Sequence, residues 1–143
     1  MIEVEVLGVG RAPQAPAPVE LEELCAQTAA RLGLEDGHVA IEFVDAERIA
    51  SLNIEHRGKA GPTDVLSFPI DGLDDPRPQG GASSTVEVPR ELGDIVICPE
   101  HTVDIREAVI HGMLHLLGMD HETDGGEMLA LQDDLLAALD VGR

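Results

Sequence analysis

Three histidines gather near the end of the chain. The stretch HGMLHLLGMDH, residues 111–121, contains three of the six histidines. His111 and His115 are four residues apart, the spacing that lets two imidazoles on one side of a helix converge on a metal ion. Gly118 stands where a glycine ends a helix in a left-handed turn, so the chain can double back and bring His121 to the same ion. Three neutral imidazoles with a fourth position open predict a catalytic zinc site, although iron, nickel or copper also fit nitrogen ligands.

The helix that carries the first two histidines is expected to be mostly buried. It is predicted over residues 103–117, with Thr102 as its cap and Asp104 near its positive end. Apolar residues cover nearly all of it, and the polar residues form one narrow stripe: Asp104, Glu107, His111 and His115. Because unpaired buried polar groups are costly, this stripe needs partners. One histidine on an apolar helix is usually a hydrogen-bonded core residue, but the third histidine after the glycine favours metal binding.

Gly112 bears on the chemistry of such a site. The spacing H-x3-H-x2-G-x2-H matches the metzincin peptidases, in which the residue after the first histidine is a glutamate that acts as general base. In this chain Gly112 occupies that position. The pattern therefore predicts shared metal geometry without shared chemistry, and a metalloprotease-like hydrolase is a minor alternative.

The rest of the chain predicts a single α+β domain over residues 1–143, with a small mixed sheet of about four strands packed by helices. Alternating apolar residues or short apolar runs indicate the strands, and apolar stripes at helical spacing indicate the helices. Thr28 falls within one of these stripes, so its hydroxyl must donate to a backbone carbonyl if it is buried. Cys25 and Cys98 have no metal-type spacing and are interpreted as small core residues. Candidate strands cover residues 2–6, 38–44, 64–70, 85–88 and 93–98, and candidate helices 19–32, 46–55 and 126–139.

The amino-acid composition limits the kinds of partner that this protein is expected to bind. The 143 residues carry a net charge of -19, which gives no electrostatic reason to bind bulk nucleic acid or an anionic membrane. The chain has no Trp or Tyr and two Phe, so base stacking on aromatic rings is nearly excluded. RNA recognition would depend on shape, phosphate contacts and metal. The chain has no stretch of about 20 apolar residues and no signal-peptide pattern, so a cytoplasmic location is expected.

Three blocks of sequence resemble the YbeY family of bacterial endoribonucleases. HGMLHLLGMDH matches every fixed position of the family signature H-G-x-L-H-L-x-G-x-D-H. NIEHRGKAGPTDVLSFP, residues 53–69, is similar to the family's N-x-x-x-R-x-x-x-x-P-T-D-V-L-S-F-P, and LGDIVI, residues 92–97, to its L-G-D-I block. The blocks keep the family's order and spacing.

The resemblance implies a metal-dependent ribonuclease directed at single strands, with one zinc ion held by His111, His115 and His121. It implies a role in maturation of ribosomal RNA, notably the 3′ end of the small-subunit RNA, and in ribosome quality control. Ribosomal RNA would be the substrate, ribosomal proteins or an assembly GTPase are candidate partners, and no DNA or membrane is expected. Only thirteen residues, Cys98–Ile110, separate the L-G-D-I strand from the histidine helix. Family members usually have a longer segment there, and the contacts that its additional residues make with RNA or a ribosomal partner do not carry over to this chain.

Arg57 matches the family's active-site arginine and is the candidate catalytic residue. It lies in a local basic run with His56 and Lys59, and its guanidinium can hold a phosphate bidentately. Five other polar residues have two interpretations each, one that places them in the cleft or next to a metal ligand and one in which they serve only the fold: Thr63, Asp64, Ser67, Glu107 and Asp120. The general base is not identified. A non-catalytic, zinc-stabilised ribosome-assembly factor is the alternative from a different class, favoured by the acidic charge and the scarce aromatics.

Overall fold

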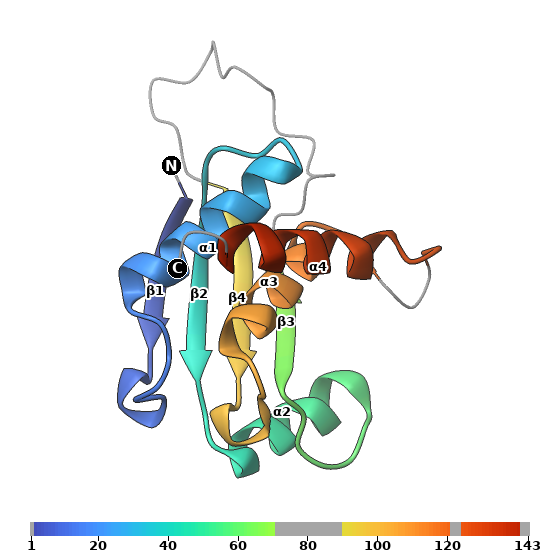
Figure 1. The fold of residues 1–143 in the computed structure, drawn as a ribbon. Coiled ribbons are helices and arrows are strands. Elements are labelled where there is room, and N and C mark those ends of the chain that lie inside the picture. The colour runs from blue at the N-terminus through green and yellow to red at the C-terminus, as the bar shows by residue number, and fades with distance from the viewer. Residues whose placement is uncertain (1, 71–89, 121–123, 141–143) are drawn as a thin grey trace, which may run out of the picture.

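The computed structural model describes residues 2–70, 90–120 and 124–140, which form a four-stranded mixed sheet with helices on both faces (Figure 1). This confirms the predicted α+β class. The predicted strand over residues 85–88 lies outside the described residues. In chain order the elements are β1 (Ile2–Leu7), η1 (Val9–Arg11), α1 (Pro18–Arg31), β2 (Gly37–Phe43), α2 (Ala46–Arg57), β3 (Val65–Pro69), β4 (Glu91–Ile97), η2 (Pro99–His101), α3 (Ile105–Leu116) and α4 (Glu127–Asp140).

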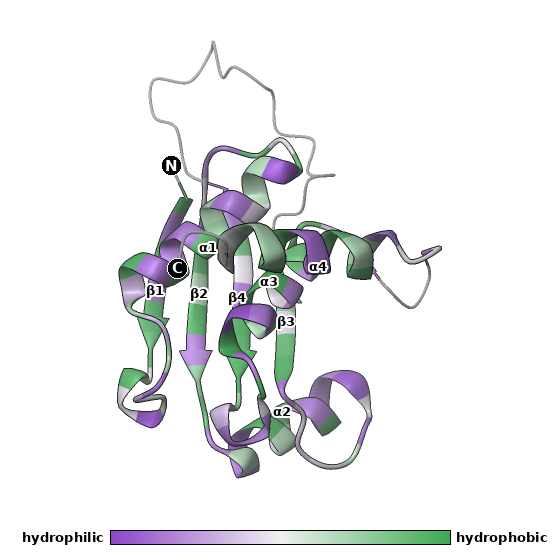
Figure 2. Cartoon of the chain, in the orientation of Figure 1, coloured by the Kyte–Doolittle hydropathy of each residue, from purple (hydrophilic) through white to green (hydrophobic). Residues whose placement is uncertain are grey.

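The strands are ordered β1-β2-β4-β3. β1 runs parallel to β2 and β2 parallel to β4, whereas β3 is antiparallel to β4 and forms one edge. Side chains of β2 alternate between buried and half-buried along the strand, which is the period of a strand with one face in the core. Figure 2 shows most of β2 and β3 in green, the colour of hydrophobic residues.

Two cores lie on opposite faces of the sheet. The larger one joins α1, α3 and α4 to the inner face, where Ile95 and Ile97 of β4 are fully buried. Val96, the residue between them, points to the other face and packs in the smaller core with Ile49 and Leu52 of α2. α3 contacts β3 and β4 of the sheet as well as the helices α1 and α4, and most of its residues are buried, so the predicted burial of the histidine helix is confirmed.

Three small side chains that the sequence analysis singled out are buried: Thr28, Cys25 and Cys98. Thr28 is fully buried and donates its hydroxyl to the Leu24 carbonyl at 2.7 Å, as the sequence required. Cys25 and Cys98 are buried free thiols, which confirms their interpretation as core residues. Burial raises the pKa of the Cys25 thiol, so it stays protonated and unreactive at neutral pH.

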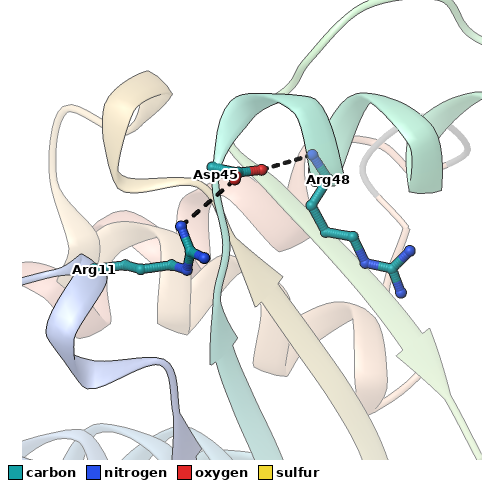
Figure 3. A network of polar contacts seen from close by, with 3 residues as sticks. All are labelled: Arg11, Asp45 and Arg48. Carbon is teal, nitrogen blue, oxygen red and sulfur yellow. Dashed lines mark hydrogen bonds and ion pairs between the residues drawn. The ribbon is translucent and has the colours of Figure 1, made fainter.

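Asp45 fixes the start of α2. Its Oδ1 accepts a hydrogen bond from the Arg48 backbone N–H at 2.8 Å, and its Oδ2 lies 3.5 Å from Nη1 of Arg11 in η1 (Figure 3). The first contact satisfies one of the free N–H groups of the helix N-terminus. The second connects the segment after β1 to the helix that ends at Arg57. Within the described ranges, no helix is long and apolar enough to cross a membrane.

Candidate metal centre

The local sequence sets both ends of α3. Asp104 is the cap, because its Oδ1 accepts from the Arg106 backbone N–H at 3.0 Å. The prediction that Thr102 caps this helix is wrong: its hydroxyl donates instead to the Cys98 carbonyl at 2.7 Å, within the turn formed by η2. The helix therefore begins at Ile105, and three residues separate it from η2.

Gly118 ends the helix as predicted. It has a φ of 99°, which glycine adopts without a steric penalty. The Gly118 N–H donates to the His115 carbonyl, and the Met119 N–H donates to the Leu114 carbonyl, both at 3.0 Å. This pair of bonds is the Schellman motif. The chain thus turns away from the helix axis at Gly118, three residues after His115 and before the segment that contains His121. His121 itself lies outside the described residues.

The structure brings the imidazoles of His111 and His115 together. Their Nε2 atoms are 3.2 Å apart, with ring centroids 4.7 Å apart and ring planes at 75°. Two nitrogens that each lie about 2.0–2.1 Å from a tetrahedral zinc ion are about 3.3–3.4 Å apart. The observed separation therefore fits two ligands of one ion. Within the described residues no group of three candidate ligands is found.

Gln132 of α4 completes this arrangement and was not predicted. Its Oε1 lies 2.7 Å from Nδ1 of His111, and its side chain is buried at 7% exposure. Among the α4 residues whose burial the structure describes, Met128, Gln132 and Leu135 are buried, at the spacing of one helix face. A glutamine inside an otherwise apolar stripe is the sequence signal that could have identified it, as the polar stripe did for α3.

Gly112 faces the sheet rather than the histidine side of α3. A Cβ atom at this position would lie 2.7 Å from Cγ2 of Ile95, closer than real contacts allow. The glycine therefore lets α3 approach β4 closely. A glutamate at position 112 would point into the buried interface, so this helix has no room for the peptidase base at that position.

Arg57 lies on a different element from the histidines, as the last residue of α2. Two contacts hold the end of this helix. Nδ2 of the buried Asn53 donates to the Gly61 carbonyl at 2.9 Å, which closes the turn after Arg57. The His56 ring packs edge-to-face on Phe68 of β3, with centroids 4.8 Å apart. Arg57 is exposed at the end of the helix, and these contacts anchor the turn that leads from it into β3.

Ser67 connects that strand to the histidine helix. Its hydroxyl donates to the Gly112 carbonyl at 3.3 Å, next to His111 in the chain. Asp64 serves the turn before β3, because its Oδ1 accepts from the Val65 N–H at 2.9 Å and from the Thr63 hydroxyl at 3.2 Å. Glu107 and Asp120 are exposed. Arg57 and the histidine pair thus come from α2 and α3, two elements that are joined through β3.

Comparison with known proteins gives a consistent result. Residues 17–140 match the family model described as Endoribonuclease YbeY. A relative named Endoribonuclease YbeY from Corynebacterium efficiens is 42% identical over 118 residues, which cover 71% of this chain and 57% of the relative. The chain thus spans little more than half the length of that relative.

Two further matches extend over nearly the whole chain. An Endoribonuclease YbeY from Rubrobacter xylanophilus is 36% identical over 142 residues and covers 95% of both chains. The solution structure of a Thermotoga maritima protein is similar with a TM-score of 0.52 and 25% identity, covering 95% of this chain and 88% of that one. On the extent of these matches, this chain belongs to the YbeY endoribonuclease family.

Proposed function

We propose that the protein is a zinc-dependent, single-strand-specific endoribonuclease that matures ribosomal RNA, at the 3′ end of the small-subunit RNA, and takes part in ribosome quality control in the cytoplasm. The observation that carries the proposal is the pair of Nε2 atoms 3.2 Å apart on α3, in a chain of an endoribonuclease family. The separate block around Arg57 supports it, because a guanidinium can hold and neutralise the phosphate on which a metal ion acts.

His111, His115 and His121 would hold the ion. A zinc ion in this position supplies Lewis acidity for chemistry at a phosphodiester. The protein fixes the imidazoles by building two of them into a helix that is buried against the sheet and closed by Gly118. His121 follows the turn at the end of that helix, and its role rests on the sequence pattern alone.

Arg57 would bind the phosphate. A guanidinium offers two parallel N–H donors to two phosphate oxygens, which orients the group as well as neutralising its charge. The contacts of Asn53 and His56 hold the backbone next to Arg57 against the following turn and β3. In a chain of net charge -19, such a local cation is needed to draw in a polyanion.

The alternatives make different demands on the molecule. The buried orientation of position 112 argues against a metalloprotease-like hydrolase. A non-catalytic ribosome-assembly factor, with ribosomal proteins or an assembly GTPase as partners, suits the acidic charge and would need the zinc only for the fold.

A cleavage assay with matched basic variants tests the proposal. Zinc-loaded wild type should cut single-stranded ribosomal RNA, and Arg57→Glu should keep its zinc but lose roughly 100- to 1,000-fold in rate, the usual effect of removing a group that stabilises transition-state charge. Lys59→Glu, two residues away and also exposed, is the control for the same charge change and should retain most activity. His115→Ala should lose both zinc and cleavage.

Two results would contradict the proposal. One is that freshly chelated protein, shown by metal analysis to lack zinc, cuts RNA as fast as the loaded form. The other is that Arg57→Glu and Lys59→Glu cut RNA at the same rate. If the Arg57 and His115 variants still bind a ribosomal partner and rescue a deletion strain, the assembly-factor alternative holds instead.

A further inference from the structure

The contact between Gln132 and His111 determines which imidazole nitrogen carries a proton. Oε1 of Gln132 is a carbonyl oxygen and can only accept a hydrogen bond. Nδ1 of His111, 2.7 Å away, must therefore be the donor. In a neutral imidazole only one nitrogen is protonated, so Nε2 of His111 is the unprotonated nitrogen and carries the lone pair. That lone pair is on the nitrogen that faces His115.

The burial of Gln132 shows that this partner is required. Its side chain is 7% exposed and lies between the apolar residues Met128 and Leu135 on the inner face of α4. A buried amide without a partner costs about 1–3 kcal/mol. A glutamine in this stripe is stable there only because α3 presents a polar group to it, and the group presented is the imidazole of His111.

We propose that Gln132 is a positioning residue of the metal centre: it holds His111 with Nδ1 protonated and Nε2 directed at the ion. This inference rests on the metal site of the proposed function. Metal-binding imidazoles commonly donate their second N–H to such an acceptor, which fixes both the tautomer and the ring orientation. The same contact links α3 to α4, the two helices that flank the segment containing His121.

Three variants separate positioning from packing. Gln132→Leu keeps the volume but removes the acceptor, whereas Gln132→Glu keeps an acceptor oxygen at the same reach. Leu131→Ala is the control, because Leu131 is a partly buried neighbour on α4 that packs against the apolar core. It removes packing of the same helix and leaves the amide in place.

The test uses the full chain and two measurements that involve no RNA. Long-range ¹H–¹⁵N NMR spectra of the zinc-free protein report the tautomer of His111, and competition with a chromophoric chelator reports the affinity for Zn²⁺. Wild type should show His111 protonated on Nδ1. Gln132→Leu should lose this preference and bind zinc roughly 10- to 100-fold more weakly, the usual effect of losing such a partner.

The controls sharpen the outcome. Gln132→Glu should restore the tautomer and bring the affinity close to that of wild type, and Leu131→Ala should change neither, even if it lowers the stability. The inference is overturned if His111 of wild type is protonated on Nε2, as it would be with the amide turned around, or if Gln132→Leu binds zinc like wild type. Failure of the proposed ribonuclease activity would be seen separately, as zinc-loaded wild type that does not cut RNA.

Discussion

Replacing Gly112 with alanine adds one methyl group where α3 meets β4. The new Cβ would lie 2.7 Å from Cγ2 of Ile95 and 3.1 and 3.2 Å from its Cγ1 and Cδ1. Carbon atoms in favourable contact are about 3.5–4.0 Å apart. The two elements must therefore separate by several tenths of an ångström, or Ile95 must leave its rotamer. Ile95 is fully buried on a central strand, so neither adjustment is easy.

Two terms set the size of the effect. Overpacking a core by a methyl group costs about 1–3 kcal/mol. Alanine is a better helix former than glycine by about 1 kcal/mol, which offsets part of that cost. The net loss of unfolding free energy should be about 0–2 kcal/mol, and the branched, buried neighbour places the expectation in the upper half of this range.

Urea denaturation of the zinc-free protein, followed by circular dichroism, measures this loss. Ile95→Ala alone should cost about 2–5 kcal/mol because it opens a cavity. The double variant should be less destabilised than the sum of the two, since the alanine methyl group fills part of that cavity.

Gly10→Ala is the matched control for the added methyl group. A Cβ atom at that position meets nothing within 4 Å, so its effect should stay within about 0.5 kcal/mol. The reasoning would be refuted by a Gly112→Ala protein at least as stable as wild type, or by a double variant whose loss is additive.

Three further predictions concern the scaffold. Asp45→Ala should lower the unfolding free energy by about 1 kcal/mol because the Arg48 N–H loses its cap, whereas Asp45→Asn should largely keep the stability; urea denaturation decides between them. The raised pKa of Cys25 predicts that this thiol reacts with Ellman's reagent at neutral pH only after unfolding, so rapid labelling of the native protein at Cys25 would contradict its burial. The same raised pKa predicts that the thiol's contribution to the unfolding free energy is full below its ordinary pKa of about 9 and is lost as the pH rises above that value. Arg31→Ala removes an exposed ion pair of 2.6 Å with Asp134, and the thermal midpoint should change little and equally at low and high salt, since such pairs contribute little.

The features that sequence predicts well here are local and periodic. The polar stripe of α3 was recognisable because helical spacing alone places His111 and His115 on one side, and the structure confirms their convergence. The end of the helix was predictable because a left-handed residue at Gly118 is a requirement of the backbone. Thr28 could be assigned its own carbonyl partner for the same reason, since that partner is four residues away.

The parts that were missed depend on contacts between distant segments or on competition between neighbours. Gln132 meets His111 across 21 positions of sequence, so its role appears only once α4 is packed on α3. Thr102 and Asp104 both have side chains suited to capping α3. Asp104 is the cap, because the Thr102 hydroxyl donates to the Cys98 carbonyl in the turn of η2. The sequence analysis considered Gly112 only as the position where the peptidases have their catalytic glutamate. The structure shows that the glycine also allows α3 to pack close to β4.

The central claim is that His111, His115 and His121 hold one metal ion, and zinc stoichiometry with zinc-edge X-ray absorption tests it most directly. The account predicts one zinc per wild-type chain, with three imidazole nitrogens about 2.0–2.1 Å away. Alanine at any one of the three histidines should abolish stoichiometric binding, while His101→Ala, an exposed histidine of η2, should keep it. A chain without zinc after loading, or variants of all three histidines that bind zinc as wild type does, would contradict the account.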